Sequence, residues 1–320
     1  MKKLMFALVA AGAAAVMGDA IESQNIVGYQ DVSKGAVKQP MFGFTFTPVS
    51  GAATVKLGAV TAKGMIGGSD IIQVINPTTL GMTTAYTYYS DAQARAEAAE
   101  EAEGETGATS GEDYDEVYAE VYDELKELVG WWVGAALGGT SADDVDIAVG
   151  SGFLGLSDTA NNISFTCNGE APTTSKAYCA GAVKQPIIAN FLPARMYLKD
   201  ILVGGMVGGS DIIQVINPTT LGMTTAYTYY SDAQARAEAA EEAESETGAT
   251  SGEDYDEVYA EVYDELKELV GWWVGAALGG TSADNVIVEP GDAFLVLSDT
   301  ANALTFNFKS VLDLTPIAAE

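Results

Sequence analysis

The sequence predicts a mainly β protein: two tandem antiparallel β-sandwich or barrel-like domains, each with an inserted acidic α-helical hairpin. The first observation is an internal repeat, because residues 67–143 recur as 208–284 with only Gly104 against Ser245. A repeat of this length is typical of duplicated domains. The second is that short β-branched and aromatic segments alternate with Gly, Pro and Ser, as strands and turns do. The third is an acidic stretch of high helix propensity inside each copy.

The length and the N-terminus predict the domain boundaries. Lys2 and Lys3 precede an apolar run at 4–18, and a small-residue cleavage site ends at Ala20. We therefore expect a signal peptide at 1–20, a first β domain at 21–170 and a second at 171–320. The helical insertions are placed at 90–129 and 231–270. The apolar run is too short to span a membrane, so we expect secretion to the extracellular space or cell surface and no membrane span in the mature chain.

Strands are expected on both sides of each acidic segment. Aromatic and small residues alternate from Ala85 to Tyr89, which suits a half-buried strand. The predicted strands of the first repeat are 25–32, 42–49, 70–75, 83–89, 131–136, 146–156 and 162–167, and later counterparts are 272–277, 287–297 and 303–308.

The acidic segment predicts two helices joined by a turn. Ser90 and Gln93 form a capping-box pattern before a helix at 91–103, and Ser110 offers a second cap before a helix at 112–129. Apolar residues of the second helix fall at three- and four-residue steps and form one stripe. Its tyrosines are Tyr114, Tyr118 and Tyr122, repeated as Tyr255, Tyr259 and Tyr263. They form the core of the hairpin, pack on the sheet, or make a partner face for another molecule.

The negative charge is concentrated in the same segments. The chain carries a net charge of −30, and residues 91–127 hold 14 carboxylates against Arg95 and Lys126. Such a segment repels nucleic acid phosphates. It offers hard oxygen ligands for weakly bound calcium, although it lacks the EF-hand register. A diffuse cloud of counterions is the alternative.

Several motifs resemble those of a known group of proteins. The predicted mature start runs Glu22-Ser23-Gln24-Asn25-Ile26-Val27-Gly28-Tyr29, and the later motifs are Tyr-Thr-Tyr-Tyr at 86–89, Gly-Trp-Trp at 130–132 and Gly-x-Gly-Phe at 150–153. Together they resemble a loose family of secreted bacterial β-rich proteins of unassigned function, whose mature chains begin with an Asn-(Ile/Val)-Val-Gly-Tyr strand. The resemblance implies secretion and a β-sandwich-like unit, with no activity attached. The acidic hairpin and the double copy depart from that pattern.

The composition argues against the common catalytic sites. The chain contains no histidine, which excludes Ser-His-Asp and Cys-His arrangements and the usual zinc ligand sets. The GxGxxG match at 150–155 lies in strand-like sequence with no helix after it, so it does not indicate a nucleotide site. We therefore predict no enzyme activity, no catalytic residue, no protein-bound metal and no cofactor.

The two cysteines are predicted to pair. Cys167 ends a predicted strand of the first repeat and Cys179 begins the second repeat. An even pair in an exported chain is typical of a disulfide, which would link the two repeats at their junction.

The positions equivalent to these cysteines at the outer ends of the chain are Ser33 and Phe308, so only the middle of the chain has the cysteine pair. This asymmetry suggests a mechanism of assembly. If the segment before the second repeat completes the sheet of the first, the N-terminal strand could complete a sheet of another molecule. This assembly strand is Asn25, Ile26, Val27, Gly28 and Tyr29. A head-to-tail contact that does not close forms a filament. We therefore expect a self-associating secreted structural protein, a subunit of an extracellular filament or surface layer.

The alternative is a binding or adhesion module that recognises a glycan or protein through surface aromatic residues, with a platform that includes Trp131, Trp132, Trp272 and Trp273. Because adjacent residues of a strand point to opposite faces, one tryptophan of each pair is expected in the core.

Overall fold

The structure is a computed structural model of the 320-residue chain. It describes residues 26–33, 41–44, 52–75, 82–157, 163–171, 176–181, 186–208, 210–216, 223–275, 277, 279–298, 303–314 and 317. The predicted signal peptide at 1–20 and Asn25 lie outside these residues.

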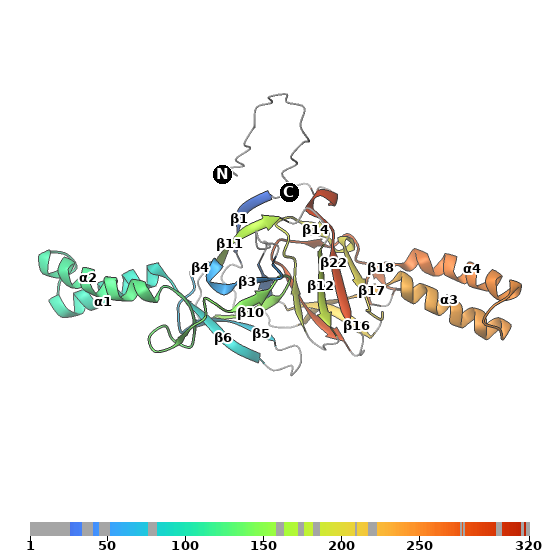
Figure 1. Cartoon of the computed structure of the whole chain (residues 1–320), viewed down its shortest axis with the longest axis horizontal. Coiled ribbons are helices and arrows are strands. Elements are labelled where there is room, and N and C mark those ends of the chain that lie inside the picture. Colours follow the sequence, from blue (N-terminus) through green and yellow to red (C-terminus); the bar gives the residue numbers. More distant parts are fainter. Residues whose placement is uncertain are drawn as a thin grey trace, which may run out of the picture.

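The first repeat contains eleven strands and two α-helices among the described residues (Figure 1). They are β1 (Ile26–Ser33), β2 (Met41–Gly43), β3 (Thr54–Lys56), β4 (Val60–Lys63), β5 (Asp70–Ile75), β6 (Met82–Tyr89), α1 (Asp91–Thr106), α2 (Glu112–Leu125), β7 (Gly130–Val133), β8 (Thr140–Ser141), β9 (Asp146–Ala148), β10 (Gly152–Ser157) and β11 (Ser164–Ala171), with short 3₁₀ turns at Leu57–Ala59 and Lys126–Leu128.

The second repeat follows the same order. Its elements are β12 (Lys176–Gly181), β13 (Ile187–Ala189), β14 (Met196–Tyr197), β15 (Ile201–Gly204), β16 (Asp211–Ile216), β17 (Met223–Tyr230), α3 (Asp232–Thr247), α4 (Glu253–Leu266), β18 (Gly271–Val274), β19 (Thr281–Ser282), β20 (Ile287–Val288), β21 (Ala293–Ser298) and β22 (Leu304–Phe308), with 3₁₀ turns at Leu198–Asp200, Lys267–Leu269 and Val311–Asp313.

Each repeat builds three sheets with matching strand orders. The first has a six-stranded sheet β2-β10-β5-β6-β7-β8, a three-stranded sheet β1-β11-β4 and the pair β3-β9. The second has β13-β21-β16-β17-β18-β19, β12-β22-β15 and β14-β20. All strand pairs in these sheets are antiparallel. The predicted β-rich repeats with one helical hairpin each are therefore confirmed.

The six-stranded and three-stranded sheets of a repeat share one hydrophobic core. In the first repeat Trp131 of β7, Phe153 of β10 and Phe165 of β11 are at most 1% exposed and belong to the same cluster. Trp131 also donates its indole N–H to the Val60 carbonyl at 2.7 Å, which ties β7 to β4. In the second repeat Trp272 is equally buried and bonds Ile201 at 2.8 Å.

Several elements differ from those expected. The predicted strand at 146–156 is two strands, because Gly150 has a positive φ of 87° and turns the chain between β9 and β10. The short strands β3, β4 and β8 were not predicted. They are only two to four residues long, which is too short to show a periodic pattern.

The two repeats face each other through a pseudo-two-fold contact. The Gly43 N–H donates to Gly291 O at 2.9 Å, and the equivalent Ala189 N–H donates to Gly150 O at 2.9 Å. Around these bonds lies an apolar cluster drawn from both repeats, namely Met41, Ile187, Ala189, Ala293 and Leu295. The hairpins extend from opposite ends of the resulting β body (Figure 1).

In the part of the chain that the structure describes, no helix is both long enough and apolar enough to cross a membrane.

Candidate interaction site: the two acidic hairpins

The first helix of each hairpin is joined to the sheet by polar contacts at its base. The Ser90 hydroxyl accepts from the Gln93 N–H at 3.1 Å, so Ser90 is the N-cap of α1 as predicted, but the reciprocal half of the predicted capping box is not formed. The Gln93 side chain in turn accepts from the Gly67 N–H at 2.8 Å and donates to Glu97 at 2.8 Å. These contacts make α1 a continuation of the body rather than a free segment.

Tyr89 completes this attachment from the end of β6. Its ring is 3% exposed, and its hydroxyl donates to Glu97 at 2.5 Å. Burial first, and then the hydrogen bond to Glu97, raise the pKa of Tyr89 well above its ordinary value. The Tyr89 phenol therefore stays protonated, and able to donate, to a higher pH than an ordinary tyrosine.

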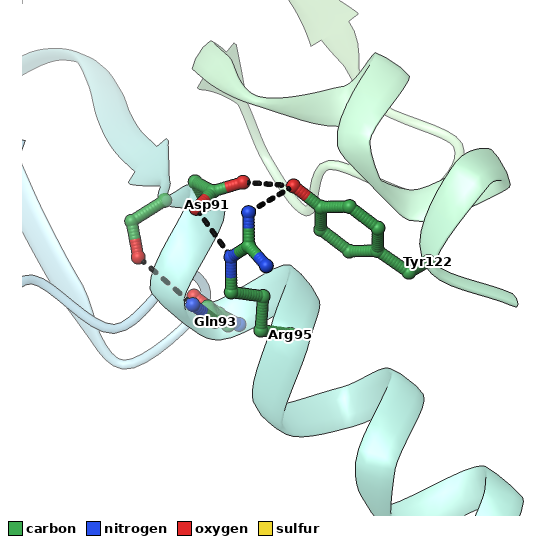
Figure 2. A network of polar contacts seen from close by, with 5 residues as sticks. Asp91, Gln93, Arg95 and Tyr122 are labelled. Carbon is green, nitrogen blue, oxygen red and sulfur yellow. Dashed lines mark hydrogen bonds and ion pairs between the residues drawn. The ribbon is translucent and has the colours of Figure 1, made fainter. Parts of the chain in front are cut away.

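The second helix is held to the start of the first by a three-residue network (Figure 2). The Asp91 carboxylate accepts from the Arg95 Nε–H at 2.8 Å and from the Tyr122 hydroxyl at 2.5 Å, and Arg95 also donates to the Tyr122 oxygen at 2.8 Å. The hydrogen bonds from Tyr122 and Arg95 lower the pKa of Asp91. The Asp91 hydrogen bond raises the pKa of Tyr122.

The network was only partly visible in the sequence. Asp91 and Arg95 stand four residues apart on one helix, the spacing of a surface ion pair. Tyr122 lies 31 residues after Asp91, and only the turn of the hairpin brings it back to α1. Asp232, Arg236 and Tyr263 repeat the arrangement in the second hairpin.

The two helices pack through a row of small residues. Ala94, Ala98 and Ala102 of α1 are fully buried. In contrast, no residue of α2 is fully buried. Because alanine side chains are short, α2 lies close to α1, yet a single helix cannot cover its whole apolar stripe.

The predicted tyrosines form a ladder along α2. The rings of Tyr114 and Tyr118 stack with centroids 6.1 Å apart, and those of Tyr118 and Tyr122 with centroids 5.9 Å apart. The Arg95 guanidinium lies 4.5 Å from the centre of the Tyr122 ring. All three rings are half-buried, and Tyr255, Tyr259 and Tyr263 repeat the ladder.

The predicted cap of the second helix is wrong. The N-cap residue of α2 is Gly111, with φ of 120°, and it makes no side-chain capping bond. Ser110 lies one residue too early. The turn instead uses the positive φ of Gly107 and Gly111, which costs a glycine little.

Each hairpin keeps a large excess of negative charge. Both of its cations are already paired, Arg95 with Asp91 at 2.8 Å and Lys126 with Asp123 at 2.6 Å. With 14 carboxylates against these two cations, the segment 91–127 retains twelve uncompensated charges. Among the described residues, no three His, Cys, Asp or Glu side chains converge into a metal site. Weak calcium association with the hairpins stays a prediction.

One tryptophan of each adjacent pair lies in the core, as the strand alternation predicts, so at most the other could belong to a binding platform. Trp131 and Trp272 are 0% exposed and belong to the cores. Their neighbours Trp132 and Trp273 are half-buried and pack at the hairpin bases, where Trp132 donates to Leu128 O at 2.7 Å. Adjacent residues of a strand point to opposite faces, which is why the pairs divide in this way.

The assumption behind strand exchange is contradicted. β1 pairs with β11 of its own repeat over eight residues, from Ile26 opposite Ala171 to Ser33 opposite Ser164. β12 pairs with β22 of the second repeat, so it does not complete the first. Both repeats therefore hold their own first strand within one chain. Exchange between molecules would require β1 to leave this pairing, and it stays a prediction.

The positions of the cysteines do not support the predicted disulfide. Cys167 lies in β11, and its side chain is 3% exposed in the core of the first repeat. Cys179 lies in β12, in the three-stranded sheet of the second repeat, and its side chain is outside the described part. The two residues thus belong to different sheets of different repeats.

Two depressions among the described residues contain no grouped catalytic side chains. One is an apolar crevice lined by residues such as Phe42, Met65 and Ile72. Another, open to solvent, lies at the base of the second hairpin beside Met206, Gln234 and Glu238. Glu238 is hydrogen-bonded to Tyr230 and Gln234 there, as Glu97 is to Tyr89 and Gln93.

Comparison with protein-family models, with curated proteins and with solved structures finds no match to this chain.

Proposed function

We propose that this chain is a secreted, non-catalytic structural subunit of an extracellular filament or surface layer, and that the two hairpins make the assembly contacts. The observation that carries this proposal is the presence of two nearly sequence-identical hairpins at opposite ends of one β body (Figure 1). A molecule with the same contact surface at both ends can join one neighbour at each end, and the assembly is an open chain when the rotation between successive contacts does not close a ring.

The apolar stripe of α2 provides the attraction. None of its residues is fully buried by α1, and Tyr114, Val117, Tyr118 and Val121 are all half-buried. Two hairpins side by side would form a four-helix bundle, which is the common way for helix pairs to bury such stripes. Further burial of apolar surface contributes about 25 cal/mol per Å².

The charge of the hairpins opposes this contact and makes it conditional. Each arm carries twelve uncompensated negative charges, so two arms repel each other at low ionic strength. Salt or calcium, which carboxylates bind, would screen this repulsion. The proposal therefore includes a self-association that increases with calcium concentration.

The experiment compares molecules with two, one and no functional arms. Mature protein (21–320) is examined by electron microscopy and light scattering in millimolar calcium and in chelator. The tyrosines are replaced in one arm by Y255Q/Y259Q, or in both by adding Y114Q/Y118Q. Glutamine keeps helix propensity high. Circular dichroism checks that the helices persist.

The proposal predicts fibres with two arms, dimers with one arm and single particles with none. Single particles of the unmodified protein under every condition would overturn filament formation. Fibres that survive the loss of both ladders would place the contact elsewhere, with exchange of β1 as the first alternative. A monomer that binds glycans or proteins through intact ladders would favour the binding-module function.

A further inference from the structure

The contact between the two repeats uses the same surface from each side. The antiparallel bridge between Phe42 and Asp292 has an equivalent between Ile188 and Ser151. Residues 35–40 recur as 181–186, an offset of 146, whereas residues 67–143 recur as 208–284, an offset of 141, because the second repeat is five residues shorter between these segments. Under these offsets Phe42 corresponds to Ile188, and Ser151 corresponds to Asp292. The contact is therefore built like the isologous interface of a homodimer, although it lies within one chain.

Two positions break this symmetry. A Cβ atom built on Gly43 would lie 2.1 Å from the Cβ of Ala189, which is its own equivalent in the second repeat. A Cβ on Gly152 would lie 2.3 Å from Ile187 Cγ2 and 3.0 Å from the Cβ of its equivalent, Ala293. At both positions the first repeat has glycine where the second has alanine. At Gly43 no room exists for two methyl groups, because real Cβ contacts are essentially never shorter than 3.0 Å. At Gly152 a second methyl would meet Ala293 at a tight 3.0 Å, and its main obstacle is the Ile187 side chain.

We infer that these glycine–alanine pairs make the inter-repeat surface selective, so that the face of the second repeat fits the face of a first repeat and rejects another second repeat. By the pseudo-two-fold relation, two second repeats would place Ala189 against Ala189 in the space that accepts one methyl. Selective pairing of similar surfaces commonly depends on such steric exclusion of the wrong partner.

The selectivity has a consequence for a chain that contains two similar domains. Without it, second repeats of different molecules could pair with each other and compete with closure of the chain. Domain swapping and misassembly are the usual failures of such duplicated chains. The second repeat presents Ala189 and Ala293 fully buried against the first, so closure occupies this face in each molecule.

The test, made in the full-length chain, removes the methyl group of Ala189 and adds one at Gly43, first separately and then together. Gly43→Ala is expected to lower Tm by about 5 °C, the order expected for overpacking in a chain of this size. Ala189→Gly is expected to lower it less, because it only leaves a methyl-sized void. The double variant G43A/A189G is expected to recover most of the loss, since the pair again contains one methyl.

A matched control tests whether replacing any strand glycine by alanine would lower Tm, regardless of the contact between the repeats. Gly204 ends β15, and a Cβ there would meet nothing within 4 Å, so Gly204→Ala is expected to leave Tm unchanged. If Gly43→Ala itself does not fold, the double variant still decides, because it is expected to fold. The inference is overturned if the two substitutions are additive, if Gly43→Ala is neutral, or if Gly204→Ala costs as much.

Discussion

The hydroxyl of Tyr122 donates to the carboxylate of Asp91 at 2.5 Å, which joins the second helix of the hairpin to the first residue of the first helix (Figure 2). The same carboxylate accepts from Arg95 on the other oxygen. Asp91 therefore begins α1 and also holds α2 against its base. This polar contact holds the two helices together at the base of the hairpin, and the buried alanines Ala94, Ala98 and Ala102 lie between them further along.

Removal of this hydroxyl is expected to raise the pKa of Asp91. The hydrogen bond from Tyr122 is the first cause of its lowered pKa, ahead of the bond from Arg95. In Tyr122→Phe the pKa of Asp91 should move back toward its ordinary value of 3.8. Carboxyl-detected NMR titration measures it, and the intact Asp232–Tyr263 pair of the second hairpin serves as a control in the same molecule.

The pH dependence follows from the direction of this shift. Because the pKa of Asp91 is lowered in the folded hairpin, its stabilising contribution is complete above the ordinary carboxyl pKa. It is lost as the pH falls through the lowered folded-state value. Tyr122→Phe should therefore weaken the hairpin at neutral pH and reduce its further loss of stability in acid. An unchanged Asp91 titration would contradict the role given to Tyr122.

The two serines that precede the helices should respond differently to alanine. Ser90 accepts from the Gln93 N–H, whereas α2 has no side-chain cap and begins after Gly111. Ser90→Ala is expected to destabilise the hairpin by about 1 kcal/mol, the usual cost of a lost N-cap, and Ser110→Ala by close to nothing. Hydrogen exchange of α1 amides checks this. Equal effects would mean that Ser110 does cap α2.

The sequence was sufficient to predict that α2 exists, but not the residue at which it begins. The periodicity that predicts α2 is local and strong, and α1, β5 and β6 follow from equally local patterns. The start of α2 depends on backbone angles at Gly107 and Gly111, which residue type alone does not determine. Ser and Gly both favour the N-cap position, so two adjacent candidates could not be distinguished.

Strand partners were harder to predict than strands. The segment 25–32 was expected as a strand, but its pairing with β11 joins residues more than 130 positions apart. Such pairing depends on the whole core, and nothing in the composition of either strand specifies it. The contact between Tyr122 and Asp91 could not be predicted for the same reason, because the two residues are 31 positions apart in the sequence. The tryptophan pairs were an exception, because alternation along one strand already implied that one member of each is buried.

Two glycines near the end of α1 should give opposite results with alanine. Gly104 lies inside the helix, and a Cβ there meets open space, so Gly104→Ala is expected to stabilise the hairpin by about 0.5–1 kcal/mol. Gly107 is the C-cap with φ of 69°, so Gly107→Ala is expected to destabilise it by about 1 kcal/mol.

Hydrogen exchange with mass spectrometry measures both changes. The substitution gives the mutated peptide a different mass from its counterpart in the second hairpin, which then acts as an internal reference. Ser245 is the natural residue at the position of Gly104. The unmodified second hairpin should therefore exchange more slowly than the first, and the reverse order would contradict the assignment of Gly104 to the helix interior.

Substitutions of Trp131 and Trp132 should have different effects on stability, because Trp131 lies in the core of the β body and Trp132 at the base of the hairpin. Trp131 is fully buried and donates to the Val60 carbonyl. Its ring packs edge-to-face with the ring of Tyr88, and the two ring centroids are 5.1 Å apart. Trp131→Phe removes the buried hydrogen bond to Val60 and opens a small cavity, which together should cost about 2–4 kcal/mol. Trp132→Phe should cost less, since its ring is half-buried and the Leu128 carbonyl that it bonds is reachable by water.

Urea unfolding monitored by circular dichroism distinguishes the two variants. Trp131→Phe should lower the midpoint of the transition in which strand signal is lost, while Trp132→Phe should mainly change the helical signal. Trp272→Phe is expected to match Trp131→Phe, because it donates to Ile201 in the same way. A larger loss of stability from Trp132 than from Trp131 would reverse the assignment of the two faces of β7, and with it the way in which each hairpin is mounted on the β body.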